Sequence, residues 1–444
     1  MKKFMCLLLT AVMILSCNAC AKKSPAVETA PAEEPPENTE TIAPIEMKPV
    51  DEKVTINIWH TFQGKPGENF DKVVKEFNES QDYITVQAVA QSWDEYNSKI
   101  MAALTAKNAP DIIFCSTAGD VNNYVDIDTA VDLTPYIENE NIGITDFNDF
   151  NPTIMAEAKQ WDGKMYMLPV SRTGEVMYYN ADFFKENNLE VPSTWTELHD
   201  LAISLTETSG EECMGSDFMD ENFIDMMTQA GSDFIDYESK TANFDSELAV
   251  ESLNYWKELA DAGCLRMKGD DYNLLPSFAS GLIQIVLQSS ASYDRLMNNF
   301  DVQFEIGVAQ MPTTEGTETD YVTMWGQNAV ILKSDDLRQQ AAFEFLKYWT
   351  SPENQAAWGI AYGALPIRES SIQLPEYQEF LNEALATKVL LEGYDRLGFK
   401  PAVTGGAAAN NALASCIDEI VIGTLNVEEA IAQYKADADK ALQG

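Results

Sequence analysis

The chain has 444 residues, 45% of them hydrophobic, and carries 71 Asp and Glu against 29 Lys and Arg, a formal net charge of −42. Such an acidic chain repels phosphate backbones and anionic lipid head groups, which argues against nucleic-acid binding and against charge-driven membrane binding. Only two histidines are present, which disfavours a multi-histidine metal centre and histidine-based catalysis. We therefore expect no metal and no other cofactor.

The first residues have the pattern of an export signal. A basic start precedes an apolar run from Phe4 to Leu15, which is too short to cross a bilayer core of about 30 Å. The small residue before Cys17 resembles a bacterial lipobox. Cys17 fits that pattern better than Cys20, because Ile14 stands three positions before it. We predict that residues 1–16 are a signal peptide and that Cys17 carries lipid.

The segment after this signal changes in composition. Residues 21–52 contain six prolines, eight acidic residues and no aromatic residue. A sequence of this kind cannot bury enough apolar surface to offset the entropy lost on ordering. We expect residues 17–52 to form a lipidated, disordered tether, with membrane attachment through lipid only.

Strand-like and helix-like patterns alternate from Val54 onward, which predicts an α/β fold. The initial order of strand, helix, strand, helix, strand predicts right-handed crossovers and ligand contacts at the carboxyl ends of the strands. A capping-box pattern, Thr194 with Glu197, predicts the start of a helix. Expected strands cover 54–59, 83–88, 111–115, 164–170, 176–180, 282–287, 304–309 and 328–332, and expected helices cover 70–77, 93–106 and most of the last 70 residues.

The cysteines are seven in number and scattered, unlike a disulfide framework. Cys115 lies in an apolar run and is predicted to be a buried thiol. Cys213 and Cys264 are the first pair to consider for a disulfide, but we expect no cysteine framework on which the fold depends.

Four segments carry a family resemblance when they are taken in order. They are INIWHTF at 56–62, AALTAKNAPDIIF at 102–114, DGKMYMLPVS at 162–171, and AAFEFLKYWTSPENQAAW at 341–358. Their order and spacing resemble extracellular solute-binding protein family 1, the sugar-type receptors of ABC importers that include maltose-binding protein. The resemblance covers roughly residues 53–444.

This resemblance implies a periplasmic-binding-protein-like II fold, in which two α/β lobes are joined by a hinge and the chain crosses between them three times. The implied crossings lie near 169–172, 307–312 and 364–368, so that the N-lobe comprises 53–170 and 313–365 and the C-lobe comprises 171–312 and 366–444. The implied function is capture of a carbohydrate between the lobes and delivery to ABC permease subunits. We expect a monomer without enzymatic activity.

Candidate ligand-binding residues of the first lobe follow two predicted strands. Trp59 and His60 end the first strand, where an aromatic platform beside polar groups would suit a sugar, although a core aromatic and a structural hydrogen bond are the alternatives. Thr117 and Asp120 follow the most apolar strand. A carboxylate there can accept two hydroxyl protons, but Asp120 could equally cap the next helix.

Other candidates lie at the predicted crossings and in the second lobe. A charged Arg172 beside Thr173 at a hinge needs a polar ligand or a carboxylate partner. Ser290 follows a strand of the second lobe. Trp325 and Gln327 lie past the expected second crossing. Asn410 lies in a late small-residue loop where maltose-type binders have an aromatic residue.

Trp325 is predicted to be the principal stacking platform and Trp59 the second, both facing the cleft from the same side.

Three alternatives to a sugar receptor remain. One is a glycerol-phosphate-type or other polar-solute receptor of the same family, which the sequence WH after the first strand also resembles. The second is a secreted glycoside hydrolase, and the third is a cell-surface adhesin.

Attachment by lipid gives the first testable prediction. Replacing the acylated cysteine, Cys17→Ser, should release the protein from the membrane into the soluble fraction, because the only predicted anchor is lost. Cys20→Ser is the matched control and should stay membrane-bound. Release by Cys20→Ser together with retention of Cys17→Ser would assign the lipid to the other cysteine.

Overall fold

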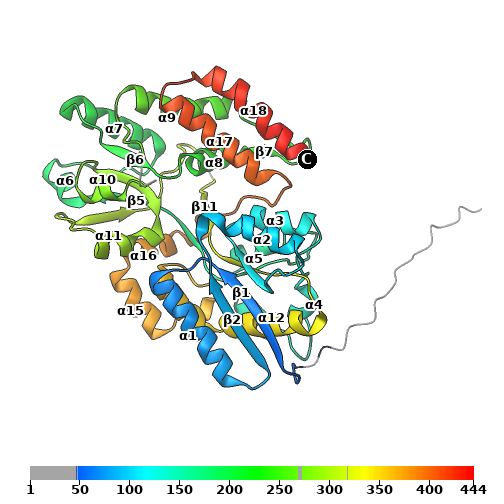
Figure 1. Ribbon diagram of the computed structural model, residues 1–444. Helices are drawn as coiled ribbons and strands as arrows, with labels where there is room; N and C mark the ends of the chain where they lie inside the picture. The colour runs from blue at the N-terminus through cyan, green and yellow to red at the C-terminus, as the bar shows by residue number, and fades with distance from the viewer. Residues whose placement is uncertain (1–46, 48, 269–272, 318) are drawn as a thin grey trace, which may run out of the picture. The chain divides into compact units, whose positions relative to one another are not determined.

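The computed structural model describes Met47 and residues 49–268, 273–317 and 319–444 (Figure 1). The predicted signal peptide, Cys17 and nearly all of the predicted tether lie outside the described residues. Met47 is only 7% exposed, and its carbonyl accepts a 3.1 Å hydrogen bond from Asn141 Nδ2. The folded body therefore includes Met47, which corrects the predicted boundary at residue 53. No helix in this described part is long and apolar enough to cross a bilayer.

The first lobe is built on a five-stranded sheet with the order β2-β1-β3-β12-β4. β1 pairs in parallel with β2 and β3, whereas β12 runs antiparallel to β3 and β4. Its strands are β1 (Val54–His60), β2 (Ile84–Ala90), β3 (Ile112–Cys115), β4 (Leu168–Pro169) and β12 (Asn328–Ile331). The predicted alternation of strands and helices at the start of the chain is confirmed.

Each helix of the first lobe buries at least one apolar residue. In α1 the buried residues are Phe70, Val73, Val74 and Phe77, the four whose spacing predicted a helix. The helices are α1 (Gly64–Ser80), α2 (Tyr96–Thr105), α3 (Ala118–Asp126), α4 (Thr134–Ile137), α5 (Pro152–Ala158), α12 (Asp336–Trp349) and α13 (Pro352–Tyr362). Residues Trp93–Glu95, predicted as the start of α2, form a separate 3₁₀ turn.

The second lobe is built on a six-stranded sheet with the order β13-β11-β5-β9-β6, in which β10 also pairs with β5. Its central strand, β5, runs antiparallel to β9, β10 and β11. The strands are β5 (Thr173–Asn180), β6 (Met214–Ser216), β9 (Ile285–Ser289), β10 (Ile306–Ala309), β11 (Val322–Trp325) and β13 (Leu397–Gly398), and a separate hairpin joins β7 (Ile235–Asp236) to β8 (Thr241–Ala242).

Helices around this second sheet include α7, which begins with the predicted capping box of Thr194 and Glu197. α17 packs against α18, α8 and α9. The helices are α6 (Ala181–Glu186), α7 (Trp195–Ser209), α8 (Met219–Gln229), α9 (Glu247–Asp261), α10 (Leu275–Ala279), α11 (Tyr293–Asn299), α16 (Leu385–Glu392), α17 (Gly406–Val421) and α18 (Val427–Gln443). Two further helices, α14 (Glu369–Ile372) and α15 (Pro375–Glu383), pack against α13 of the first lobe. The last 70 residues are mostly helical, as predicted.

The chain passes between the two lobes through short segments that connect elements of one lobe to elements of the other. The first passage lies between β4 and β5, at residues 170–172, as expected. The second lies at Gly326 and Gln327, between β11 and β12, which corrects the expectation of 307–312. The reason is that β11 pairs with β5 through Met324 and Gly174, so residues 322–325 still belong to the second sheet. The third passage follows α13 and leads to α16, which packs on β5.

Arg172 holds these passages together. Its side chain is fully buried and its Nη2 forms a 2.7 Å ion pair with Glu157 Oε2. The same guanidinium donates to the Ser171 carbonyl at 2.7 Å and to Asn328 Oδ1 at 2.8 Å. Its backbone pairs with Leu365 in both directions. Arg172 therefore joins segments of all three passages, two of them through its side chain and the third through its backbone.

Gly326 lets two of these segments approach closely. A Cβ atom at this position would lie 2.1 Å from the Ser171 carbonyl oxygen. The Gly326 amide also donates to the Ser116 carbonyl at 3.3 Å, at the end of β3. Only glycine fits at this contact without moving the backbone.

The hinge arginine gives the second prediction. Arg172→Met should lower the free energy of unfolding by about 3–5 kcal/mol, because Glu157 would be left as a buried, unpaired charge. The double variant Arg172→Met/Glu157→Leu should recover much of that loss. The measurement is urea unfolding followed by circular dichroism.

Arg266→Met is the matched control, since Arg266 pairs at 2.9 Å with Glu212 where both side chains are more than 40% exposed. An exposed pair of this kind contributes about 1 kcal/mol or less. Equal losses for Arg172→Met and Arg266→Met would show that the buried ion pair does not stabilise the hinge.

Candidate functional site

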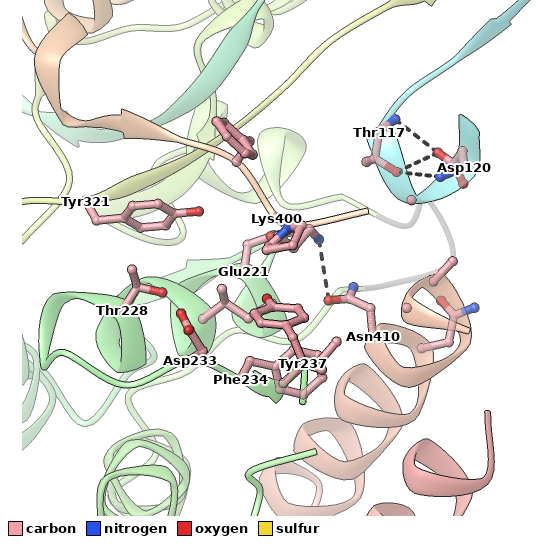
Figure 2. Close-up of a pocket in the computed structure, with 18 residues that line it drawn as sticks. Thr117, Asp120, Glu221, Thr228, Asp233, Phe234, Tyr237, Tyr321, Lys400 and Asn410 are labelled. Carbon is pink, nitrogen blue, oxygen red and sulfur yellow. Dashed lines mark hydrogen bonds and ion pairs between the residues drawn. The ribbon is translucent and has the colours of Figure 1, made fainter. Parts of the chain in front are cut away.

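A cavity of about 370 Å³ lies where α3 of the first lobe faces α8 and α17 of the second (Figure 2). The first lobe contributes a hydroxyl and a carboxylate, and the second lobe contributes hydroxyl, amide, carboxylate, ammonium and aromatic side chains. The lining residues are Thr117, Gly119, Asp120, Glu221, Ile224, Thr228, Asp233, Phe234, Ile235, Tyr237, Tyr321, Phe399, Lys400, Pro401, Gly406, Ala407, Asn410 and Asn411.

Thr117 and Asp120 form the first-lobe wall of this cavity. α3 begins directly after β3, so its first turn lies at the carboxyl end of a buried parallel strand. Thr117 Oγ1 accepts from the Asp120 amide at 3.1 Å, and Asp120 Oδ2 accepts from the Thr117 amide at 3.1 Å. Asp120 therefore caps the helix and lines the cavity at once, so the two readings of this residue do not exclude each other.

Lys400 is the basic residue of the second-lobe wall. Its ammonium forms a 2.5 Å ion pair with Glu221 and lies 3.4 Å from Asn410 Oδ1. Asn410 Nδ2 in turn donates to Asp220 at 2.9 Å. Burial by itself lowers the pKa of Lys400, but Glu221, Asp220 and Asp120 outweigh it and raise that pKa above its ordinary value. Lys400 is thus a cation held among carboxylates.

Aromatic side chains supply the apolar surface of the cavity. Phe234 is 6% exposed and stacks on Phe244 with ring centroids 5.4 Å apart, which fixes its position. Tyr237 is 37% exposed and its pKa is raised by burial and by the nearby Asp233. Figure 2 shows Phe234 and Tyr237 side by side on one wall. Tyr321, the residue before β11, lies on another wall.

Two buried acidic residues, Asp225 and Glu175, lie behind the wall that carries Tyr321. Asp225 on α8 accepts hydrogen bonds from the amide and hydroxyl of Thr323 at 2.9 and 2.6 Å. Burial raises the pKa of Asp225 to about 8, against the lowering effect of Thr323, and the charge of Glu221 adds to the rise. Glu175 on β5 is also buried, its pKa is raised well above the ordinary value by burial, and it accepts from Asn222. Burial therefore disfavours the charged form of both carboxyl groups.

A smaller cavity of about 190 Å³ shares Asp120 with the larger one. Trp93 lies at this cavity and is 62% exposed, which is unusual for so large an apolar side chain. The 3₁₀ turn that carries it follows the carboxyl end of β2. Trp93 was predicted to lie in a helix and not to belong to the site; its position just after a strand was the available signal. Gln327 also lines this cavity.

Several predicted site residues do not line the larger cavity. His60 is 3% exposed, its Nδ1 accepts from the Phe62 amide at 3.2 Å, and burial lowers its pKa. Trp59 packs against the core, and its carbonyl accepts from Tyr96 at 2.7 Å. Arg172 has Glu157 as its partner, the alternative that the sequence left open.

Trp325, Thr173 and Ser290 lie in or beside the second sheet. Thr173 donates to the Trp325 carbonyl at 3.2 Å, and the Trp325 ring lies 5.1 Å from that of Phe218. Ser290 is 1% exposed. Trp59 and Trp325 therefore come from different lobes, which corrects the expectation that both face the cleft from one side. The sequence predicted otherwise because β11 was assigned to the wrong lobe.

The cysteines in the described part are free and buried. They are Cys115, Cys213, Cys264 and Cys416. Cys115 lies in β3, as predicted, and burial raises its pKa well above the ordinary value. Cys213 and Cys264 are backbone neighbours, with the Cys213 amide donating to the Cys264 carbonyl at 2.9 Å. Across the described residues, no group of three or more His, Cys, Asp and Glu side chains is placed to hold a metal ion.

Comparison with known proteins places this architecture in a family. The model of a bacterial extracellular solute-binding protein family matches residues 72–384. The chain belongs to this family. Its members are extracytoplasmic solute receptors, and the resemblance seen in the sequence is confirmed.

Individual relatives agree with this assignment. The sn-glycerol-3-phosphate-binding periplasmic protein UgpB of Escherichia coli K12 is 25% identical over 345 residues, which are 73% of this chain and 77% of that protein. The cyclic α-maltosyl-1,6-maltose binding protein of Arthrobacter globiformis is 24% identical with a TM-score of 0.75, over 88% of this chain and 99% of that one. UgpB of Mycobacterium tuberculosis, solved with glycerophosphocholine, is 18% identical with a TM-score of 0.77 at the same coverage. The two-lobed fold is confirmed.

Asp225 gives the third prediction. Its pKa is about 8 in the folded protein and 3.8 ordinarily, so between these values the folded state binds one proton that the unfolded state has lost. Raising the pH from 5 to 8 should therefore lower the free energy of unfolding, by up to about 1.4 kcal/mol per pH unit. Asp225→Asn has no titrating carboxyl group at this position, so its free energy of unfolding should change less with pH. Urea unfolding across this pH range measures both, and parallel profiles would contradict the assignment.

Proposed function

We propose that this protein is the sugar receptor of an ABC importer, binding a mono- or oligosaccharide between its lobes and delivering it to the permease. The observation that carries the proposal is the cavity of about 370 Å³ lined from both lobes. Its volume lies within the range of small-molecule sites, roughly 300–1,000 Å³. Domain interfaces are frequent places for such sites.

The chemistry of the cavity supports a sugar. Sugars present apolar C–H faces and polar hydroxyl groups, which aromatic rings and hydrogen-bonding side chains complement. Thr117, Asp120 and Asn410, three of the residues chosen from the sequence, line the cavity with the aromatic Phe234 and Tyr237. We assign the polar contacts with the solute to Thr117, Asp120 and Asn410. Gln327 and Trp93 extend the site into the smaller cavity.

Contacts across the cleft support a closing movement. Lys65 on α1 forms a 2.6 Å ion pair with Asp294 on α11, although both side chains are more than half exposed. Near the cavity, the Thr404 hydroxyl donates to Asp126 at 2.9 Å and the Ala402 amide to Gln160 at 2.7 Å. These contacts are polar, and a bound solute can add to the energy that favours the closed state.

The remaining assignments complete the receptor. Lipid on Cys17 and a tether would keep a monomeric receptor at the outer face of the membrane, near its permease. The first lobe would comprise residues up to 170 and 327–365, and the second lobe the rest of the folded body. Binding and release need no chemical step, so we assign no catalytic residues.

A receptor for glycerol-phosphate-type solutes is the second candidate, favoured by the similarity to UgpB of Escherichia coli. A phosphate needs cationic or amide donors around it. In this cavity the ammonium of Lys400 is already paired with Glu221. We therefore rank a sugar first.

Stacking on the exposed tryptophan gives the fourth prediction. Trp93→Ala should weaken binding of the best sugar by about 30-fold or more, since truncation of a central aromatic anchor typically costs about 2–4 kcal/mol. The measurement is a thermal-shift screen of mono-, di- and oligosaccharides and glycerol phosphates, followed by calorimetry with the best solute. Trp325→Ala, measured alongside, tests the second-lobe aromatic that the sequence favoured.

Tyr83→Ala is the matched control, because Tyr83 is an aromatic residue 46% exposed that does not line either cavity. It should bind as the wild type does. Unchanged affinity in both tryptophan variants would place the stacking platform elsewhere. A screen in which no solute raises the melting temperature would contradict the receptor function itself.

A further inference from the structure

The larger cavity carries more negative than positive charge. Three of its lining residues are acidic, Asp120, Glu221 and Asp233, against the single basic Lys400. Glu221 and Lys400 neutralise each other as an ion pair. Throughout the described residues, no Lys or Arg side chain forms an ion pair with Asp120 or Asp233. Asp120 and Asp233 therefore line the cavity without an ion-pair partner, although the Asp120 carboxylate also accepts hydrogen bonds from the amide and hydroxyl of Thr117.

Lys400 is poorly placed to receive an anion. Its ammonium contacts Glu221 and Asn410, and Asn410 is bound to Asp220 just behind it. An anionic group approaching Lys400 would meet the negative charge of these carboxylates and of Asp120 across the cleft. The same field attracts a cation, because opposite charges within a few ångströms of each other stabilise one another.

These two carboxylates belong to different lobes. Figure 2 shows Asp120 at the start of α3 and Asp233 on the opposite wall, beside Tyr237. Asp233 and Tyr237 are both exposed, so a solute can reach them. Aromatic ring faces attract cations, and ammonium groups are commonly bound where a ring and a carboxylate act together. Charge and aromatic surface thus coincide on one wall.

We propose that this cavity selects hydroxylated solutes that carry a positively charged nitrogen. Asp233 and Tyr237 bind the nitrogen, Asp120 adds counter-charge from the first lobe, and Asn410 and Thr117 bind hydroxyl groups. This ligand class rests on the receptor function proposed above and narrows it. The shared chemistry allows two sources of the cation, a primary ammonium on a sugar or a quaternary ammonium on a small alcohol.

Matched pairs of probes test the charge directly. The first pair is the glucosamine disaccharide against its di-N-acetylated form, and the second is choline against 3,3-dimethylbutanol, which has the same shape without charge. Calorimetry on the processed full-length chain should show at least one cationic member binding about tenfold or more tighter than its neutral partner. The pair that shows the difference identifies the source. sn-Glycerol 3-phosphate should bind more weakly than that cationic member.

Charge-neutralising variants connect the selectivity to the cavity. Asp233→Asn should reduce the preference for the cationic member by roughly three- to tenfold, and added salt should reduce it in the wild type. Asp437→Asn is the control, an exposed residue of α18 with the same change in charge that does not line the cavity. It should leave the preference unchanged.

The outcomes separate this ligand class from the receptor function. Equal or tighter binding of the neutral member in both pairs, or tightest binding of glycerol 3-phosphate, overturns the cationic class while the receptor function stands. A preference that survives Asp233→Asn overturns the assigned site. If neither these probes nor any sugar binds, both proposals fail.

Discussion

A buried guanidinium at the hinge is the contact on which the two-lobed arrangement depends. Arg172 pairs with Glu157 and donates to Ser171 and Asn328, while its backbone pairs with Leu365. These partners lie on or beside the three passages between the lobes. A charge buried so completely is stable only while every partner is in place, so it fixes the relative path of the passages.

The firm hinge contrasts with the weak contacts across the cleft. Lys65 and Asp294 form a 2.6 Å pair between α1 and α11, but exposed ion pairs contribute about 1 kcal/mol or less. The lobes can therefore separate without disturbing the hinge. A solute that contacts Asp120 on one side and Tyr237 on the other adds affinity only to the closed arrangement. In the proposed receptor, the binding energy of such a solute would shift the equilibrium toward the closed arrangement.

The sequence predicted the parts of this architecture that depend on local patterns and on strand order. Thr117 and Asp120 could be found because they follow the most apolar strand, and the structure places both on the cavity. The second passage was misplaced because β11 is four residues long and is held by pairing with β5, a long-range contact that no local pattern reveals. Trp93 was not predicted as a site residue because the residues that follow it have the apolar pattern of a helix. The partner of Arg172 could not be chosen, since Glu157 lies fifteen residues away in another element.

Hydrogen–deuterium exchange with and without the best solute from the screen tests the central claim, that one solute contacts both lobes at this cavity. We predict slower exchange at the start of α3, around residues 117–124, together with slower exchange at 399–411 in the second lobe. Amides at 170–172 should exchange equally slowly in both states, because the hinge does not open. Protection confined to one lobe, or lying away from both segments, would contradict the account.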